Sequence, residues 1–225
     1  MFAGAIIAAM ELLNHILPAL FSAAPRIANK GSHHDKLDLK DWSFITFNRL
    51  ITVPFIYVCI KFLWNSPRVM WGAASLTLLN TVLPYVLLHL VYDFMYTWFH
   101  RVLHIRWLYG LVHKHHHRQH SPSRGNLDAI NVHPFEFVVG ESMHLISLSL
   151  LTALGMDVHV GTFVVFIGLG GIMASLNHTR FAVYVPPSIY DVRWHDVHHR
   201  MPNVNMGQYI TLWDRVFGTF QEYRG

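Results

Sequence analysis

Long apolar runs separated by short polar stretches dominate the pattern of this 225-residue chain. About 20 consecutive apolar residues in an α-helix cross the hydrocarbon core of a bilayer, and five runs approach that length. Only Met156, Asp157 and Val158 separate the last two runs, which predicts a helical hairpin. The five predicted spans are residues 1–21, 44–64, 69–91, 137–155 and 159–177.

The first run carries the weakest membrane signal, because Glu11, Asn14 and His15 interrupt it. A helix lying in the membrane interface is the alternative to a span. A cleaved signal peptide is not expected, because no basic residue precedes the apolar stretch.

The third run is expected to begin a helix at Val69 that continues to the histidines beyond it, with Pro84 as a candidate kink. At 1.5 Å per residue, and with about 20 residues inside the hydrocarbon, His100 would lie on the order of 15 Å beyond the membrane core.

The composition supports a membrane protein. Charged residues make up 13% of the chain, whereas a soluble domain carries about 25%. The single cysteine, Cys59, lies in an apolar run, so neither a disulfide framework nor a CxxC metal site is expected. The net charge of +4 comes from scattered residues without a basic stripe, so no nucleic-acid partner is expected.

The basic residues predict which ends of the spans share one side of the membrane. Fourteen of the seventeen lysines and arginines fall in residues 22–43, 100–133 and 178–225. Five alternating crossings place these segments on the same side, which the positive-inside rule identifies as the cytosol. The sequence therefore predicts an all-α, multi-pass helical bundle whose last segment forms a cytosolic cap.

Histidines form three groups within the same segments. Residues at i, i+3 and i+4 share a helix face, so each group is expected to aim its imidazoles at one point. Neutral imidazole is a ligand for zinc, iron, copper and nickel, and the cap is therefore expected to bind metal. The groups are His100 and His104; His113, His116 and His117; and His195, His198 and His199.

Other histidines fall outside this pattern. His115 and His120 adjoin the second group but leave its face, and their role stays open. The remaining ones are expected to be structural or surface residues: His15, His33, His34, His89, His144 and His159.

These motifs resemble the sterol desaturase/fatty acid hydroxylase superfamily of membrane non-haem di-metal enzymes. The resemblance covers about residues 69–220, and the eight residues between the first two histidine groups are similar to this superfamily rather than to the acyl-CoA desaturases. The matching stretches are YDFMYTWFHRVLH (92–104), HKHHH (113–117), NVHPFE (131–136), NHT (177–179), WHDVHH (194–199) and NMGQYITLWDRVFGTF (205–220).

The resemblance implies nine metal ligands and two domains, residues 1–68 with the N-terminal membrane segments and linker and 69–225 as a fatty acid hydroxylase-like catalytic domain. Ala174 occupies a position that is histidine in the fatty acid 2-hydroxylase branch, which favours a sterol-type branch. Whether His133 contacts metal stays open. The implied ligands are His100, His104, His113, His116, His117, His178, His195, His198 and His199.

Ligating histidines need a partner for the second ring nitrogen. Asp93 lies two helical turns before His100, and Asn177 and Asp196 adjoin other predicted ligands. These three are the main candidates, and Asp128 and Glu136 are weaker ones.

The resemblance further implies two iron ions, with zinc as an alternative occupant in recombinant material, and O₂ as co-substrate. The expected function is hydroxylation or desaturation of a sterol or related lipid from the bilayer, with electrons from an external donor such as cytochrome b5 and its reductase. In a eukaryote, the expected location is the endoplasmic reticulum membrane. A non-catalytic metal-binding or metal-transport protein is the alternative, although transporters bind their cargo near the midplane. A zinc protease is not expected, because Arg101 replaces the glutamate of HExxH.

Overall fold

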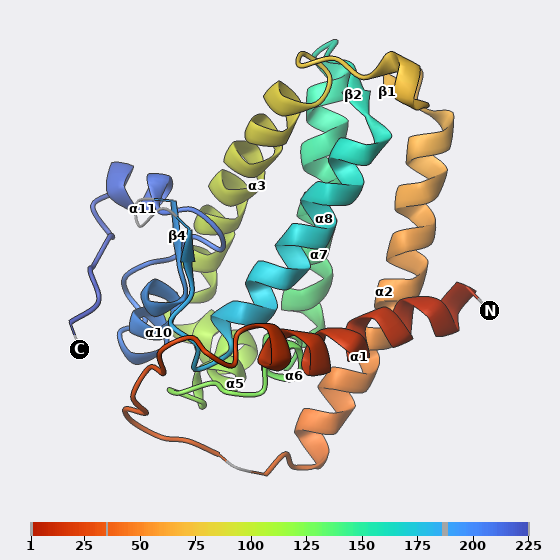
Figure 1. Ribbon diagram of the computed structural model, residues 1–225. Helices are drawn as coiled ribbons and strands as arrows, with labels where there is room; N and C mark the ends of the chain where they lie inside the picture. The colour runs from red at the N-terminus through yellow and green to blue at the C-terminus, as the bar shows by residue number, and fades with distance from the viewer. Residues whose placement is uncertain (1, 35, 186–188, 225) are drawn as a thin grey trace.

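Four long helices run along one axis in the computed structural model, which describes residues 2–34, 36–185 and 189–224 (Figure 1). Helix α7 packs against α2 and α3, and α8 packs against α3. The expectation of an all-α membrane bundle is confirmed. The four helices are α2 (Leu39–Asn65), α3 (Val82–Leu103), α7 (Pro134–Ala153) and α8 (Val160–Asn177).

Helices α7 and α8 form the predicted hairpin. Pro134 is the first residue of α7, where a missing N–H costs no helical hydrogen bond. His159 caps α8 by accepting a hydrogen bond from Gly161 N–H at 3.1 Å. The connection also contains strand β2 (Val158–His159), which pairs in parallel with β1 (Val69–Met70) and ties the hairpin to the segment after α2.

The expected helix start at Val69 is wrong. Residues 69–81 form strand β1, a 3₁₀ turn η1 (Ala73–Ser75) and an irregular turn, with Gly72 at a φ of 84° and Asn80 accepting a hydrogen bond from Thr77 N–H. Pro84 lies in the first turn of α3, where it starts the helix instead of kinking it.

This later start also corrects the expected depth of His100. The residue lies 18 positions after Val82, which corresponds to about 27 Å of helix. A bilayer core is about 30 Å thick. His100 therefore lies near the end of a helix about as long as the bilayer core is thick, and the estimate of about 15 Å beyond the core, which counted from Val69, no longer follows.

Helix α1 (Phe2–Leu20) lies across the bundle instead of along it (Figure 1). Two of the three polar residues that interrupt its apolar run face the bundle, because Glu11 pairs with Arg49 and Asn14 accepts a hydrogen bond from Leu127 N–H, whereas His15 is exposed. Four helices instead of five therefore run lengthwise, and the orientation of α1 fits the interfacial alternative.

Length and composition alone qualify four described helices to cross a membrane, namely α1, α2, α7 and α8. Helix α3 does not qualify, because polar residues such as Asp93 and His89 interrupt it. The predicted span over residues 69–91 is therefore wrong in its start, and the helix found there does not meet the composition of a membrane span.

Most of the remaining elements gather near the end of the bundle where α3 and α8 finish (Figure 1). Helix α11 lies beside α3, where Trp213 donates a hydrogen bond to the carbonyl oxygen of Leu90 at 3.0 Å, so the last segment only partly caps the bundle. These elements are α4 (Arg106–Leu108), the π-helical turn η2 (Tyr109–His113), α5 (Lys114–His117), α6 (Asn126–Ala129), β3 (Tyr184–Val185) paired with β4 (Tyr190–Asp191), α10 (Val192–Arg200) and α11 (Leu212–Val216).

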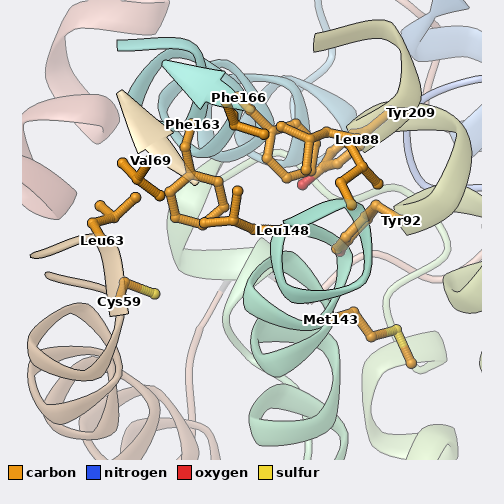
Figure 2. Packing of buried hydrophobic residues seen from close by; sticks show 12 residues of the cluster. Cys59, Leu63, Val69, Leu88, Tyr92, Met143, Leu148, Phe163, Phe166 and Tyr209 are labelled. Atoms are coloured by element: carbon orange, nitrogen blue, oxygen red, sulfur yellow. The ribbon is translucent and has the colours of Figure 1, made fainter. Parts of the chain in front are cut away.

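The hydrophobic core lies between α2, α3, α7 and α8 (Figure 2). Leu88, Leu148, Phe163 and Phe166 are among its most deeply buried side chains. They come from the first half of α3, the last half of α7 and the first half of α8, so this core holds the helices together away from the histidines. Cys59 is buried in the same core as a free thiol.

Candidate metal centre

The nine histidines predicted as ligands come together in two groups. Within each group, one ring nitrogen of every member lies within 4.8 Å of the others. Eight of the nine are buried and His104 is half-buried. The first group is His100, His104, His113, His117 and His198, and the second is His116, His178, His195 and His199.

The expectation that each histidine motif aims at a single point holds for His100 and His104, which both join the first group, but is wrong for the second and third motifs. His113 and His117 join the first group, whereas His116 joins the second. In α10, His195 and His199 stay together, and His198 joins the other group. At 3.6 residues per turn, positions i+3 and i+4 point about 100° apart, so the second and third motifs each supply both groups.

In four of these histidines, the Nδ1 atom contacts a main-chain carbonyl oxygen. In the first group, Nδ1 of His100 lies 2.8 Å from the carbonyl oxygen of Met206, and Nδ1 of His198 lies 2.7 Å from that of Val204. In the second group, His178 and His199 contact the carbonyls of Ala174 and Gln119 at 2.8 Å and 2.9 Å. Because a carbonyl only accepts, Nδ1 carries the proton and Nε2 keeps its lone pair.

The Nε2 atoms converge. In the first group, His100 and His113 approach to 2.9 Å, and His117 and His198 to 3.1 Å. In the second, Nε2 of His178 lies 3.2 Å from Nε2 of both His116 and His195. Nε2 of His104 is also buried without a hydrogen-bond partner. Where the proton sits on Nδ1, Nε2 carries only a lone pair, and such Nε2 atoms cannot donate hydrogen bonds to one another. A metal cation at each group would accept these lone pairs.

Burial keeps these rings neutral. It lowers the pKa of His104 to about 3, with a further contribution from His113. Burial and the neighbouring imidazoles also lower the pKa values of His116, His195 and His199 well below the ordinary histidine value. Neutral imidazole is the form that binds a metal, so the rings are ready to bind at neutral pH.

A family model described as Fatty acid hydroxylase matches residues 85–219, which include all nine histidines. The chain belongs to the fatty acid hydroxylase family. The resemblance to the sterol desaturase/fatty acid hydroxylase superfamily is thereby confirmed.

Curated relatives of this fatty acid hydroxylase family member share about a quarter to a third of their aligned residues with it. Lathosterol oxidase from Rattus norvegicus is 30% identical over 57% of this chain and 42% of its own length. Methylsterol monooxygenase 2-1 from Arabidopsis thaliana is 31% identical over 60% of the chain and 54% of its own. The very-long-chain aldehyde decarbonylase CER1 from the same plant is 26% identical over 89% and 32%.

The chain thus spans about a third to a half of the length of these relatives. No solved structure matches it significantly.

Asp93 and Asp196, two of the carboxylates predicted to support the ligands, contact other groups. Asp93 accepts hydrogen bonds from the main-chain N–H groups of residues 208–210 at 2.9–3.1 Å. It therefore acts on His100 only through the loop that presents the carbonyl of Met206. Asp196 pairs with Arg180 and Arg200.

Asn177 and Asp128 also bind elsewhere, since Asn177 donates to the carbonyl oxygen of Gln208 and Asp128 accepts from Arg124. Glu136, a weaker candidate, is the carboxylate beside a predicted ligand: its Oε1 lies 2.8 Å from Nδ1 of His113, at ion-pair distance although not in hydrogen-bond geometry. The four carbonyl partners were not foreseen, because every residue carries a carbonyl.

The histidines with open roles are structural. His133 belongs to neither group and caps α7 by accepting a hydrogen bond from Phe135 N–H at 3.2 Å. His115 lies 3.0 Å from Oδ1 of buried Asp41, which also pairs with Arg118. Nδ1 of His120 lies 3.2 Å from Ser32 N, on the segment between α1 and α2.

A cavity of about 510 Å³ opens beside the histidine groups, between α1, α2, α3, α7 and α8. This volume lies within the range of about 300–1,000 Å³ that is typical of small-molecule sites. Most of its lining is apolar, and it reaches Glu136 and Ala174, which contact His113 and His178. The cavity therefore ends one side chain away from both groups.

Proposed function

We propose that this protein is a membrane-bound, O₂-dependent lipid hydroxylase or desaturase with a histidine-ligated di-iron centre. The single observation that carries the proposal is the convergence of nine imidazoles in groups of five and four. Each group would hold one iron ion, and zinc would compete in recombinant material. The iron pair, when bound, supplies the O₂ activation that oxidation of an unactivated C–H bond needs and that no side chain provides.

The chain's own residues hold and shield this centre. The carbonyls of Met206, Val204, Ala174 and Gln119 fix the ring orientations, and Glu136 orients His113. Burial of the rings excludes water from the reacting carbon. The helical bundle leaves the apolar cavity for the lipid.

The substrate would be a sterol or a related lipid. The names of the relatives support this class, since they include a lathosterol oxidase and a methylsterol monooxygenase. The size and apolar lining of the cavity also suit a lipid that enters from the bilayer.

Electrons would come from an external donor such as cytochrome b5 and its reductase. Exposed Arg106 and Lys114 near the histidines would attract an acidic donor. In a eukaryotic cell, we place the protein in the endoplasmic reticulum with the histidines facing the cytosol, on the basis of the positive-inside rule.

Metal transport is disfavoured by the position of the histidines. His100 and His104 lie at the end of α3, and His178 directly follows α8. Transporters place their binding sites near the middle of membrane helices.

Lipid mass spectrometry of expressing cells tests the proposal. Cells with the wild type, with His198→Ala and with the exposed control His15→Ala are compared. A lipid that gains oxygen or loses two hydrogens should appear with the wild type and His15→Ala and be absent with His198→Ala. Iron-loaded protein that never changes a lipid or consumes O₂ would contradict the proposal.

A further inference from the structure

The cavity carries polar side chains at two levels. Asn126 and Glu136 lie near the histidines, whereas Glu141, His144 and Tyr209 line it further into the bundle. On α7, Glu141 lies five residues after Glu136, and His144 lies eight residues after Glu136. These separations correspond to about 7.5 Å and about 12 Å along the helix axis. The deeper level thus lies well away from the candidate metal centre.

The carboxyl group of Glu141 has no hydrogen bond or ion pair with any described residue, although its main-chain carbonyl contacts His144. It lies on one of the helices that qualify to cross a membrane and faces a mostly apolar cavity. An unpaired carboxyl group in such a setting is costly, and ionisable residues inside membrane proteins mark functional sites by default. The occupant of the cavity is therefore expected to supply the missing hydrogen-bond partner.

His144 and Tyr209 complete this level. Nδ1 of His144 lies 3.1 Å from the carbonyl oxygen of Glu141, so Nδ1 carries the proton and Nε2 keeps its lone pair. Nε2 makes only a long contact of 3.4 Å with the hydroxyl of Tyr209. The Tyr92 ring packs against both residues, with ring centroids 4.2 Å from His144 and 5.1 Å from Tyr209. The polar atoms are therefore held in place with spare hydrogen-bonding capacity.

We propose that Glu141, His144 and Tyr209 bind a hydroxyl group of the lipid substrate. This inference rests on the proposed function and specifies its substrate class as a hydroxylated lipid held by its polar end inside the bundle. A hydroxyl can donate to Glu141 or His144 and accept from Tyr209. A plain hydrocarbon would bury the carboxyl group against methylenes, so the site should reject it.

The binding orientation also predicts the reacting carbon. With the hydroxyl at Glu141, the apolar body of the lipid extends toward Glu136 and the histidines. The oxidised carbon would then lie about 8 Å or more from the hydroxyl, judged from the helical rise between these glutamates.

Binding of matched probes to the full chain tests this assignment. The protein is purified with its bound metal and kept without reductant, so that no turnover occurs. The probes are cholesterol with 5α-cholestane, and 1-octadecanol with octadecane. In at least one pair, the wild type should bind the alcohol at least about tenfold more tightly than the hydrocarbon.

Substitutions at Glu141 separate recognition from folding. Glu141→Leu should reduce the alcohol-to-hydrocarbon ratio to within about threefold and tighten hydrocarbon binding, whereas the near-isosteric Glu141→Gln should keep an intermediate ratio. Ser142→Ala is the matched control, because Ser142 donates to the carbonyl oxygen of Val138 and does not line the cavity.

Equal binding of alcohol and hydrocarbon by the wild type would overturn the inference, and so would an unchanged ratio in Glu141→Leu. Both measurements are made without oxidation, so a failure of the proposed oxidase activity would be seen separately in the lipid analysis of cells.

Discussion

At the scale of single residues, the second ring nitrogen decides what each histidine can do. His100, His178, His198 and His199 use main-chain carbonyls, which leaves Nε2 free to face the group. His113 faces the Glu136 carboxylate instead. A carboxylate raises the basicity of a ligating imidazole more than a carbonyl does, so Glu136 gives the first group a property that the second lacks.

Glu136→Gln should weaken metal binding by the first group on the order of 10–100-fold, as expected for loss of a supporting carboxylate. Metal content after chelator titration measures this effect, and Glu222→Gln serves as the control because Glu222 is exposed near the C-terminus. Two metals per chain with unchanged chelator resistance in Glu136→Gln would contradict the role.

The sequence favours Asp93 and Asp196 as supporting carboxylates and indicates Glu136 only as a weaker candidate. Helical spacing correctly placed Asp93 on the side of α3 that bears His100, but a loop more than a hundred residues away occupies its carboxylate. Pairing of a carboxylate depends on which distant donors reach it, and local spacing carries no information on that.

At the scale of elements, the start of α2 and the second histidine motif form one unit. Asp38 and Asp41 cap α2 reciprocally, and Asp41 also pairs with Arg118, His115 and Asn131. Asp41 is fully buried. The start of α2 is therefore bonded directly to residues that flank predicted ligands.

Asp41→Ala should destabilise the protein by about 2 kcal/mol or more, because it leaves buried donors without a partner. Thermal unfolding in detergent should show a lower Tm than for the wild type, together with reduced metal content. Lys40→Ala is the matched control, since Lys40 is an exposed neighbour. Equal Tm values for the two variants would show that the unit contributes no stability.

The hairpin of α7 and α8 lies within a few residues of its predicted bounds, whereas α3 starts 13 residues later than expected. Both hairpin helices have strong apolar runs with capping residues at their starts. The segment after Val69 is equally apolar, but pairing with β2 and the turn at Gly72 replace helix there. A strand pairing that joins residues about 90 positions apart leaves no local signature.

At the scale of the whole molecule, nine histidines with converging nitrogens lower the stability of the folded chain when no metal is bound. Lone pairs meet inside each group, and burial disfavours protonated rings. Metal binding should relieve both penalties, so removal of metal should lower the stability of the whole bundle.

Stability of the metal-free protein should fall as the pH decreases below about 6.5. The pKa of His104 is about 3 in the folded chain, against 6.5 for a free side chain, so between these values the unfolded state binds a proton that the folded state does not. Each such ring contributes up to about 1.4 kcal/mol per pH unit. The Tm after chelation should therefore be lower at pH 5.5 than at pH 7.5. An identical Tm at the two values would contradict this linkage.

The sequence by itself determined the helical membrane class, the family and the identity of the nine converging histidines. Apolar run length and motif spacing are local properties, and they follow from the helical period and from the thickness of a bilayer. Only the tertiary structure decided which histidines share a group, which carboxylate supports them, that α1 lies across the bundle and that no described residue pairs with the carboxyl group of Glu141 in the cavity. These features depend on contacts between distant segments, where packing chooses among partners that the local pattern treats as equal.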